Sequence, residues 1–322
     1  MKDSIPNRRA MLSNLLIVLP VFALILAGWL ARRSNALGPH ATREVNRLVV
    51  YLALPALLFD IMANADPARI WQPGFILAFA LGCALIFILA LAIRLKQGSH
   101  LADAAIDGLN AGYANTGFMG FPLILAVVGQ SGMAPTLVAT IVTVCVLFAV
   151  AIVLIEASLQ SQARRRDIAR KTLLALIRNP LLVAPALGAV VMISGWPLPQ
   201  TLDRFLKLLG GAASPCALIA LGLFLAENTG KTAEAGRKVE ALLIGLKLVA
   251  HPVATWVIAA PILGLAPEAV RIAVLLAALP TGTGPFMLAE FYGRQALVTS
   301  RVVLATTILS VATLSLYLAV SR

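Results

Sequence analysis

Ten apolar runs constrain the fold of this chain more than any other feature. They fall near residues 11–31, 44–63, 73–93, 104–128, 135–158, 180–196, 205–225, 240–262, 268–291 and 296–320. An α-helix needs about 20 apolar residues to cross the hydrocarbon core of a bilayer. Charged residues make up only 12% of the chain, whereas a soluble domain carries about 25%. The chain is therefore predicted to be an all-α membrane protein with ten transmembrane helices.

Glycine, proline and small polar residues interrupt two of these runs, the fourth and the ninth. The interruptions read ANTGFMGFP at 114–122 and PTGTGP at 280–285. Their prolines, Pro122 and Pro285, lie 163 positions apart, so the interruptions occupy matching places in the two halves of the chain. Backbone released from a helix cannot face lipid, so it must line a cavity or be buried in protein. Paired interruptions of this kind indicate the binding site of a secondary transporter.

Proline and glycine also recur at similar offsets elsewhere in the two halves. The pairs are Pro20 with Pro185, Pro55 with Pro215, and Gly129 with Gly293. Together with the interruptions they predict two five-helix repeats, at 1–159 and 180–322, joined by a basic loop at 160–179. Because five is odd, the second repeat inserts with the opposite orientation. The broken helices 4 and 9 are then expected to cross near the middle of the membrane.

The net charge of +12 is explained by an uneven distribution of basic residues. Seventeen of the 26 Lys and Arg residues fall in the connections that follow odd-numbered helices, with Arg164–Arg166 the densest run. The positive-inside rule places this side, including the 160–179 loop, in the cytoplasm and both termini outside. The charge is therefore interpreted as a topology signal and not as a nucleic-acid surface.

Catalytic and metal-binding motifs are missing from the sequence. The three cysteines and three histidines are widely separated. Zinc-site, P-loop, hydrolase and dinucleotide patterns do not occur. We therefore expect no enzyme activity, no metal and no cofactor.

The two interruptions are expected to bind an anion. A half-helix that begins near Pro122 or Pro285 presents free backbone N–H groups and the positive end of its dipole. Short polar side chains add neutral donors, and glycines allow close approach. The predicted substrate-binding residues are Asn115, Thr116, Gly117, Gly120, Pro122, Pro280, Thr281, Gly282, Thr283, Gly284 and Pro285. The alternative is that these residues form kinks that serve only helix packing.

Lys247 is the one basic residue well inside a predicted span. An ionisable group at that depth is a functional candidate by default. It would attract the substrate or couple transport to a change in protonation. The alternative is a fixed ion pair with Asp60, Glu156 or Glu290. His251, four residues later on the same helical face, is placed to hydrogen-bond with it.

Six motifs occur in order along the chain: NRLVVYLALPALLF (46–59), NTGFMGFPL (115–123), NPLLVAPALG (179–188), PCALIALGLFL (215–225), LKLVAHP (246–252) and LPTGTGPFMLAEFYG (279–293). Together they resemble the auxin efflux carrier family within the bile acid/arsenite transporter group. The resemblance implies ten helices in inverted repeats, a crossover of helices 4 and 9, and a homodimer in a bacterial inner membrane. The family often carries an amide residue near the second interruption. Here Thr281–Gly284 instead resembles the malonate-carrier subgroup.

The resulting functional prediction is a secondary carrier of a small organic anion, preferably a malonate-like dicarboxylate. Import of a dianion would require coupled H⁺ or Na⁺, whereas export would not. One alternative is an exporter of another carboxylate or of an amino-acid-like solute. The other is a membrane sensor or scaffold that does not transport.

Overall fold

The computed structural model describes residues 5–159, 174, 176–227 and 234–320. Its regular structure over these residues is helical. The elements are α1 (Ile5–Arg33), α2 (Ala41–Leu48), η1 (Val49–Ala53), α3 (Leu54–Ala63), α4 (Pro67–Ile70), α5 (Pro73–Lys96), α6 (Leu101–Gly112), η2 (Thr116–Gly120), α7 (Phe121–Val127), η3 (Gln130–Gly132), α8 (Met133–Thr140), η4 (Ile141–Leu147), α9 (Phe148–Leu159), α11 (Pro180–Ser194), α12 (Gln200–Gly211), α13 (Ala213–Glu227), α14 (Glu234–Gly245), η5 (Leu246–Ala250), α15 (His251–Val257), η6 (Ile258–Ile262), α16 (Pro267–Ala277), α17 (Gly284–Phe291) and α18 (Ala296–Val320).

Helix lies within each of the ten apolar ranges expected from the sequence, with ends that differ by a few residues. Six described helices are long and apolar enough to cross a membrane: Ala41–Ala63, Pro73–Lys96, Gln130–Leu159, Gln200–Glu227, Gly236–Ile262 and Ala296–Val320. Thr116–Val127 and Pro180–Ser194 are shorter apolar helices. The predicted basic loop at 160–179 lies mostly outside the described residues, as does the run Arg164–Arg166.

Local capping signals account for several helix ends. The Asn179 side chain accepts the N–H of Leu181 at 3.0 Å, and Pro180 occupies the first helical position of α11. The Asn179 side chain thus satisfies one of the free N–H groups of the first helical turn. Pro180 has no N–H, so it leaves no donor without a partner at this position. The same helix ends at Gly195, whose φ of 67° is a left-handed conformation that glycine adopts without strain.

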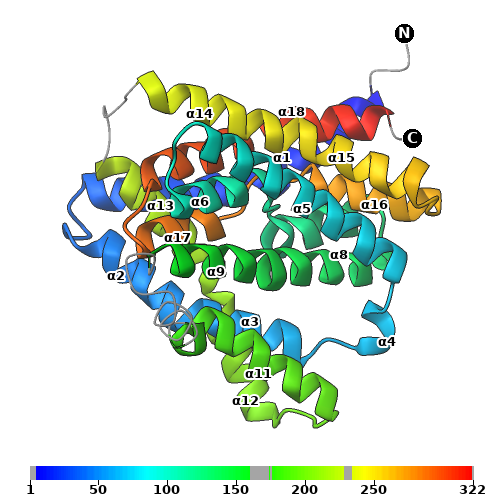
Figure 1. The fold of residues 1–322 in the computed structure, drawn as a ribbon, viewed down its shortest axis with the longest axis horizontal. Coiled ribbons are helices and arrows are strands. Elements are labelled where there is room, and N and C mark those ends of the chain that lie inside the picture. The colour runs from blue at the N-terminus through cyan, green and yellow to red at the C-terminus, as the bar shows by residue number, and fades with distance from the viewer. Residues whose placement is uncertain (1–4, 160–173, 175, 228–233, 321–322) are drawn as a thin grey trace.

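The helices form two groups that pack mainly among themselves. We call α1, α2, η1, α3, α11, α12 and α13 the panel, and α5–α9, α14–α18 and the η segments among them the core bundle. In Figure 1, α3, α11 and α12 of the panel project from one edge of the molecule, below α8 and α9. Inside the panel, α1 and α13 approach closely because Gly28 lies against the Ile219 carbonyl and Gly222 against the Ile25 carbonyl.

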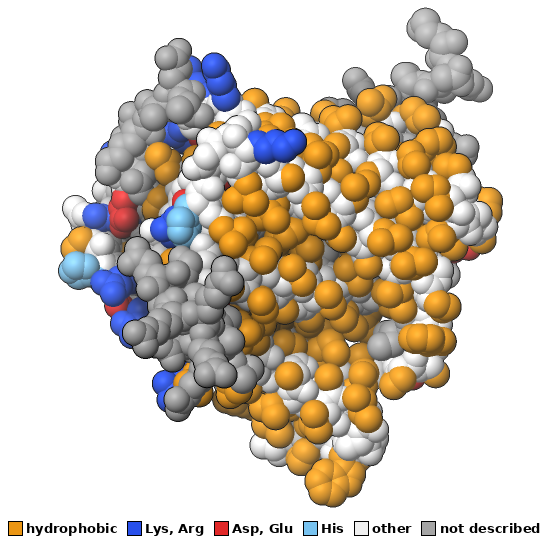
Figure 2. Space-filling model, viewed as in Figure 1, with side chains coloured by type: hydrophobic (Ala, Val, Ile, Leu, Met, Phe, Trp, Pro, Cys, Tyr) orange, Lys and Arg blue, Asp and Glu red, His pale blue; other side chains and the backbone are white. Residues whose placement is uncertain are grey.

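Charged side chains gather at one end of the molecule, and apolar side chains cover most of the face in Figure 2. The ion pairs include Arg32–Glu227, Arg94–Asp107, Arg294–Asp103 and Arg301–Glu240. Many large apolar side chains are exposed, such as Ile193 on α11 and Val249 on η5. A broad apolar face next to a charged end is the surface expected of a chain that crosses a bilayer.

Candidate functional site

The two predicted interruptions separate pairs of short helices. In the first half, α6 ends at Gly112, and helix resumes only at Thr116 with the π-helical turn η2. In the second half, α16 ends at Ala277, and α17 begins at Gly284. Extended or irregular backbone therefore occupies 113–115 and 278–283, which we call the crossover.

The two segments of the crossover bond to each other. Ala114 and Thr281 form an isolated antiparallel bridge. Two hydrogen bonds flank the pair: Asn115 N–H donates to the Pro280 carbonyl at 2.9 Å, and Gly282 N–H donates to the Tyr113 carbonyl at 3.3 Å. Each segment thus supplies partners for backbone groups that its own helix has released.

The bridge gives the two halves a register that differs from the one the prolines indicate. Ala114 and Thr281 are 167 positions apart, whereas Pro122 and Pro285 are 163 apart. Counted from the bridge, Asn115–Gly117 (Asn-Thr-Gly) corresponds to Gly282–Gly284 (Gly-Thr-Gly). The difference arises because η2 adds a turn before Pro122, while Pro285 is the second residue of α17.

Threonines on two flanking helices form hydrogen bonds with the crossover and with the first residue of η2. Thr306 of α18 accepts the Thr281 N–H at 3.2 Å, and Thr143 of η4 shares a 2.8 Å hydrogen bond with the Thr116 hydroxyl. Thr143 and Thr306 are 163 positions apart, as are Thr136 and Thr299. The two halves therefore place hydroxyls of equivalent sequence position against the two crossing segments.

Both helices that leave the crossover begin with unpaired amides. Among the described residues, the backbone N–H groups of Gly117, Gly284 and Phe286 have no hydrogen-bond partner, and Pro285 has no N–H. The partial positive charge of a helix dipole resides on such amides. The start of α17 and the start of η2 therefore both offer donors to an anion.

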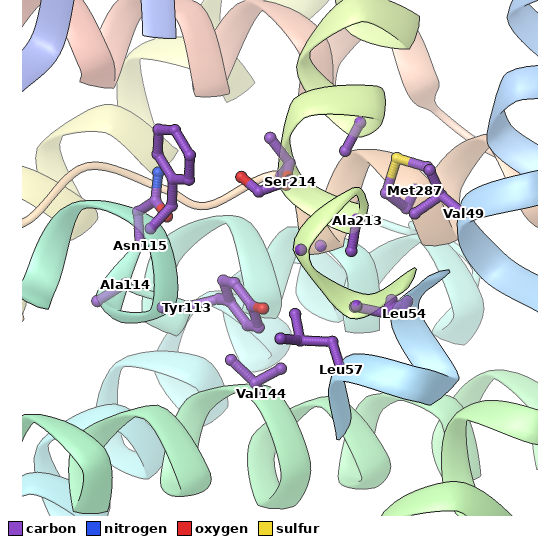
Figure 3. Close-up of a pocket in the computed structure, with 17 residues that line it drawn as sticks. Val49, Leu54, Leu57, Tyr113, Ala114, Asn115, Val144, Ala213, Ser214 and Met287 are labelled. Carbon is purple, nitrogen blue, oxygen red and sulfur yellow. The ribbon is translucent and has the colours of Figure 1, made fainter. Parts of the chain in front are cut away.

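A cavity of about 260 Å³ lies at these helix starts, between the panel and the core bundle. Its lining is Val49, Leu54, Leu57, Tyr113, Ala114, Asn115, Gly117, Phe118, Val144, Gly210, Gly211, Ala213, Ser214, Ala217, Thr283, Gly284 and Met287. In Figure 3, Tyr113, Ala114 and Asn115 of the crossover lie opposite Ala213 and Ser214 of α13. The volume is below the roughly 300–1,000 Å³ of sites for drug-sized ligands, so it suits a smaller solute.

Four of the eleven predicted site residues line this cavity: Asn115, Gly117, Thr283 and Gly284. The other seven do not line it. They are Thr116, Gly120, Pro122, Pro280, Thr281, Gly282 and Pro285. Thr116 and Thr281 are fully buried and bonded to neighbouring helices, while Pro122 and Pro285 occupy the first turns of α7 and α17.

Sequence reasoning missed the panel side of the cavity and the aromatic residue before the bridge. Tyr113 lies directly before the ANTGF motif, and Ser214 lies directly before Pro215, which the sequence paired with Pro55. The pair Gly210-Gly211, which interrupts the seventh apolar run, was an available signal. The apolar lining from helices α3 and α13 carried no such signal, because it resembles any buried helix face.

Lys247 and His251 form a buried polar cluster next to the end of α16. The Lys247 Nζ donates to the Ala277 carbonyl at 2.7 Å and lies 2.9 Å from His251 Nδ1. The other ring nitrogen, Nε2, lies 3.5 Å from the Cys83 Sγ. Both Lys247 and His251 are fully buried.

The three carboxylates considered as partners for Lys247 lie elsewhere. Asp60 accepts a 2.7 Å hydrogen bond from Asn64, and Glu156 accepts one of the same length from the Tyr292 hydroxyl. Glu290 is partly buried on α17. Within the described ranges, none of the three forms an ion pair with Lys247. Nor does any group of three His, Cys, Asp or Glu residues there have the arrangement of a metal site.

The known proteins that resemble this chain are described as transporters or efflux carriers. A family described as "Membrane transport protein" matches residues 15–318. A protein of Rhizobium meliloti (strain 1021) named "Putative malonate transporter" is 33% identical, and the match covers 93% of each chain. Auxin efflux carrier component 8 of Arabidopsis thaliana is 25% identical over 85% of this chain and 88% of its own. The "Uncharacterized transporter YfdV" of Escherichia coli (strain K12) is 26% identical over 66% of this chain and 68% of its own.

Proposed function

This chain belongs to the membrane transport protein family that includes the auxin efflux carriers, and on that premise we propose that it is a secondary transporter of a small organic anion. A malonate-like dicarboxylate is the favoured substrate. The name of the Rhizobium meliloti relative and the Thr281–Gly284 sequence support this choice. The observation that carries the proposal is the cavity at the crossover, where two helix starts with unpaired amides meet.

The lining of the cavity favours an anion on electrostatic grounds. No Asp or Glu is among the described residues that line it. The donors present are backbone amides together with the side chains of Asn115, Thr283, Ser214 and Tyr113. Helix N-termini bind carboxylates without a full countercharge, because their amides and dipole supply the attraction. A neutral, donor-rich cavity of this kind fits the carboxylate groups of a small acid.

The proposed membrane architecture is ten helices in two inverted repeats, residues 1–159 and 180–322, with a cytoplasmic loop at 160–179. The equal spacing of Thr136 with Thr299 and of Thr143 with Thr306 supports the repeat. The positive-inside rule supports termini outside a bacterial inner membrane. A homodimer is part of this proposal, as the family resemblance implies.

Alternating access would come from a rocking motion of the core bundle against the panel. The cavity lies between these two groups. Close glycine contacts tie helices together inside each group, such as Gly28 with α13 in the panel and Gly112 with α5 in the core bundle. Close backbone contacts of this kind favour motion of each group as a unit, because a close-packed interface resists rearrangement. The crossover would then carry the anion from one side to the other.

The membrane potential limits the direction of transport. Moving one charge across 100 mV is worth about 2.3 kcal/mol, so importing a dianion against an inside-negative potential costs about 4.6 kcal/mol per 100 mV. Uptake therefore needs coupled H⁺ or Na⁺, about two cations for electroneutrality. Export needs none.

Uptake of labelled malonate into proteoliposomes under imposed pH, sodium and voltage gradients tests the proposal. Asn115→Ala and Thr283→Val each remove one donor from the cavity. A hydrogen bond to a charged group is worth about 1.5–3 kcal/mol, so each substitution should weaken apparent affinity by roughly 10- to 150-fold. Thr307→Val is the matched control, because the Thr307 hydroxyl bonds only the Val303 carbonyl of its own helix.

The outcomes separate the proposed carrier from its alternatives. Flux that is unchanged in both cavity variants would argue strongly against the site. Transport of monocarboxylates or amino acids but not of malonate would indicate the alternative exporter. Absence of any flux, with intact protein in the membrane, would favour a sensor or scaffold.

A further inference from the structure

Lys247 occupies a position that joins the buried cluster to the crossover. Its amine bonds the carbonyl of Ala277, which is the last residue of α16. The chain leaves that carbonyl, runs through 278–283 and lines the cavity at Thr283 and Gly284. The amine is fully buried, so its charge cannot be satisfied by reaching the membrane surface.

Among the side chains that the structure describes, none around this amine supplies a counter-anion. His251 from α15 and Cys83 from α5 are the ionisable side chains of the cluster. On the other elements that contact η5, the described carboxylates Asp107, Asp103 and Glu240 are each paired with an arginine. The end of α16 offers only its backbone. A buried ammonium without a counter-anion is costly, and it becomes less costly when an anion sits nearby.

This lysine is present in only one half of the molecule. The negative pole of α16 points at the crossover, and the Lys247 amine donates a hydrogen bond to the last carbonyl of that helix. At the end of α6, the Asn110 carbonyl instead accepts a 2.7 Å hydrogen bond from the neutral Thr281 hydroxyl. The residue 163 positions before Lys247 is Ala84. The lysine is therefore an addition to the repeated framework and not a requirement of it.

We propose that Lys247 is the charge partner of the transported anion, and that it takes up one proton when the anion enters the cavity and releases that proton when the anion leaves. This inference rests on the proposed function. The proton comes from water and adds to the lone pair of the Nζ amine. With or without the bound anion, two N–H groups of the amine keep their hydrogen bonds to the Ala277 carbonyl and to His251. The proton is therefore gained and lost at the remaining lone pair of the nitrogen. By reciprocity, an anion that stabilises the ammonium is itself bound more tightly when Lys247 is protonated.

The consequence is that a dianion crosses the membrane together with one proton. The anion and its proton together then carry one negative charge across the membrane and not two. Import then needs only one further cation for electroneutrality.

Calorimetric titration of malonate into the purified full-length protein tests this inference. Titrations in buffers of different ionisation enthalpy, between about pH 7 and pH 10, span the range between ordinary His and Lys pKa values and report the protons taken up per anion. Proton uptake by the wild type should reach about one proton per malonate bound. In Lys247→Gln the amide retains a donor for the Ala277 carbonyl, but proton uptake should vanish and affinity should fall by about tenfold or more.

Two further variants keep the test decisive. Lys247→Arg retains a permanent charge, so it should bind malonate without taking up a proton. Lys207→Gln is the control, because Lys207 is exposed and paired with Asp203, and it should behave as the wild type. Malonate binding without proton uptake in the wild type, or uptake that persists in Lys247→Arg, overturns the inference but not the proposed function. Absence of malonate binding by folded wild type overturns the proposed function and this inference with it.

Discussion

Gly284 shows how a single residue shapes the cavity. It is the first residue of α17 and lines the cavity with its backbone. A Cβ at this position would come within 2.9 Å of the Tyr113 ring carbon Cζ and within 3.1 Å of the Phe148 ring. The missing side chain therefore leaves room for Tyr113 against the crossover and keeps the start of α17 accessible.

Gly284→Ala should lower both transport and stability. Overpacking of this kind costs typically about 1–3 kcal/mol, and a shift of Tyr113 would narrow the cavity. Gly211→Ala is the matched control, because Gly211 also lines the cavity but a Cβ there meets nothing within 4 Å. Malonate uptake and thermal unfolding in detergent measure the two effects. Equal behaviour of the two variants would contradict the role assigned to Gly284.

At the scale of elements, α1 and α13 pack through a reciprocal pair of glycines. A Cβ on Gly28 would collide with the Ile219 carbonyl, and one on Gly222 would collide with the Ile25 carbonyl. Lipid tails are as apolar as leucine, so helices in a membrane gain little from apolar burial and rely on close backbone contact instead. The rigidity of the panel depends on this contact.

Gly222→Ala should therefore lower the thermal unfolding temperature in detergent, with a cost of about 1–3 kcal/mol from the forced separation of α1 and α13. Gly245→Ala should have the opposite effect. Gly245 has helical backbone angles and open space around its Cα. Alanine there should stabilise the helix by about 0.5–1 kcal/mol. A Gly222→Ala protein as stable as the wild type would show that α1 and α13 do not depend on this close approach.

At the scale of the molecule, α17 of the core bundle contacts three elements of the panel, α2, η1 and α13. The Asn46 side chain of α2 lies 3.5 Å from the Met287 carbonyl. Two ring pairs add to this contact: Tyr51 with Phe291, with centroids 5.6 Å apart, and Phe224 with Phe286, with centroids 5.4 Å apart. A rocking motion of the core bundle must change these contacts.

A covalent link across this boundary should stop transport. In a background without the three native cysteines, Tyr51→Cys with Phe291→Cys should be joined by a short bifunctional maleimide, and uptake should be lost because the groups can no longer separate. Asn64→Cys with Asp203→Cys gives the control link inside the panel, where these side chains lie 3.1 Å apart. That link should leave uptake intact. Full uptake after complete Tyr51–Phe291 linkage would rule out relative motion at this boundary.

Several features of this protein follow from its sequence alone. Apolar length and the positions of glycine and proline are local properties, so they locate helices to within a few residues and mark where α6 and α16 end. They also identify Asn115, Gly117, Thr283 and Gly284, which line the cavity. The family resemblance is likewise a property of the sequence, and the family match over residues 15–318 confirms it.

Tertiary structure decided what depends on contacts between distant segments. The pairing of Ala114 with Thr281 sets the register of the crossover, and the proline spacing did not predict it because η2 adds a turn in one half only. The apolar panel residues opposite the crossover, such as Leu54 and Ala213, likewise carried no distinguishing signal in the sequence. The contact of Lys247 with His251 follows from their spacing on one helix, as the sequence predicted, but its bond to the Ala277 carbonyl does not. Partners on different elements are chosen by packing in three dimensions, and no local pattern in the sequence records the outcome.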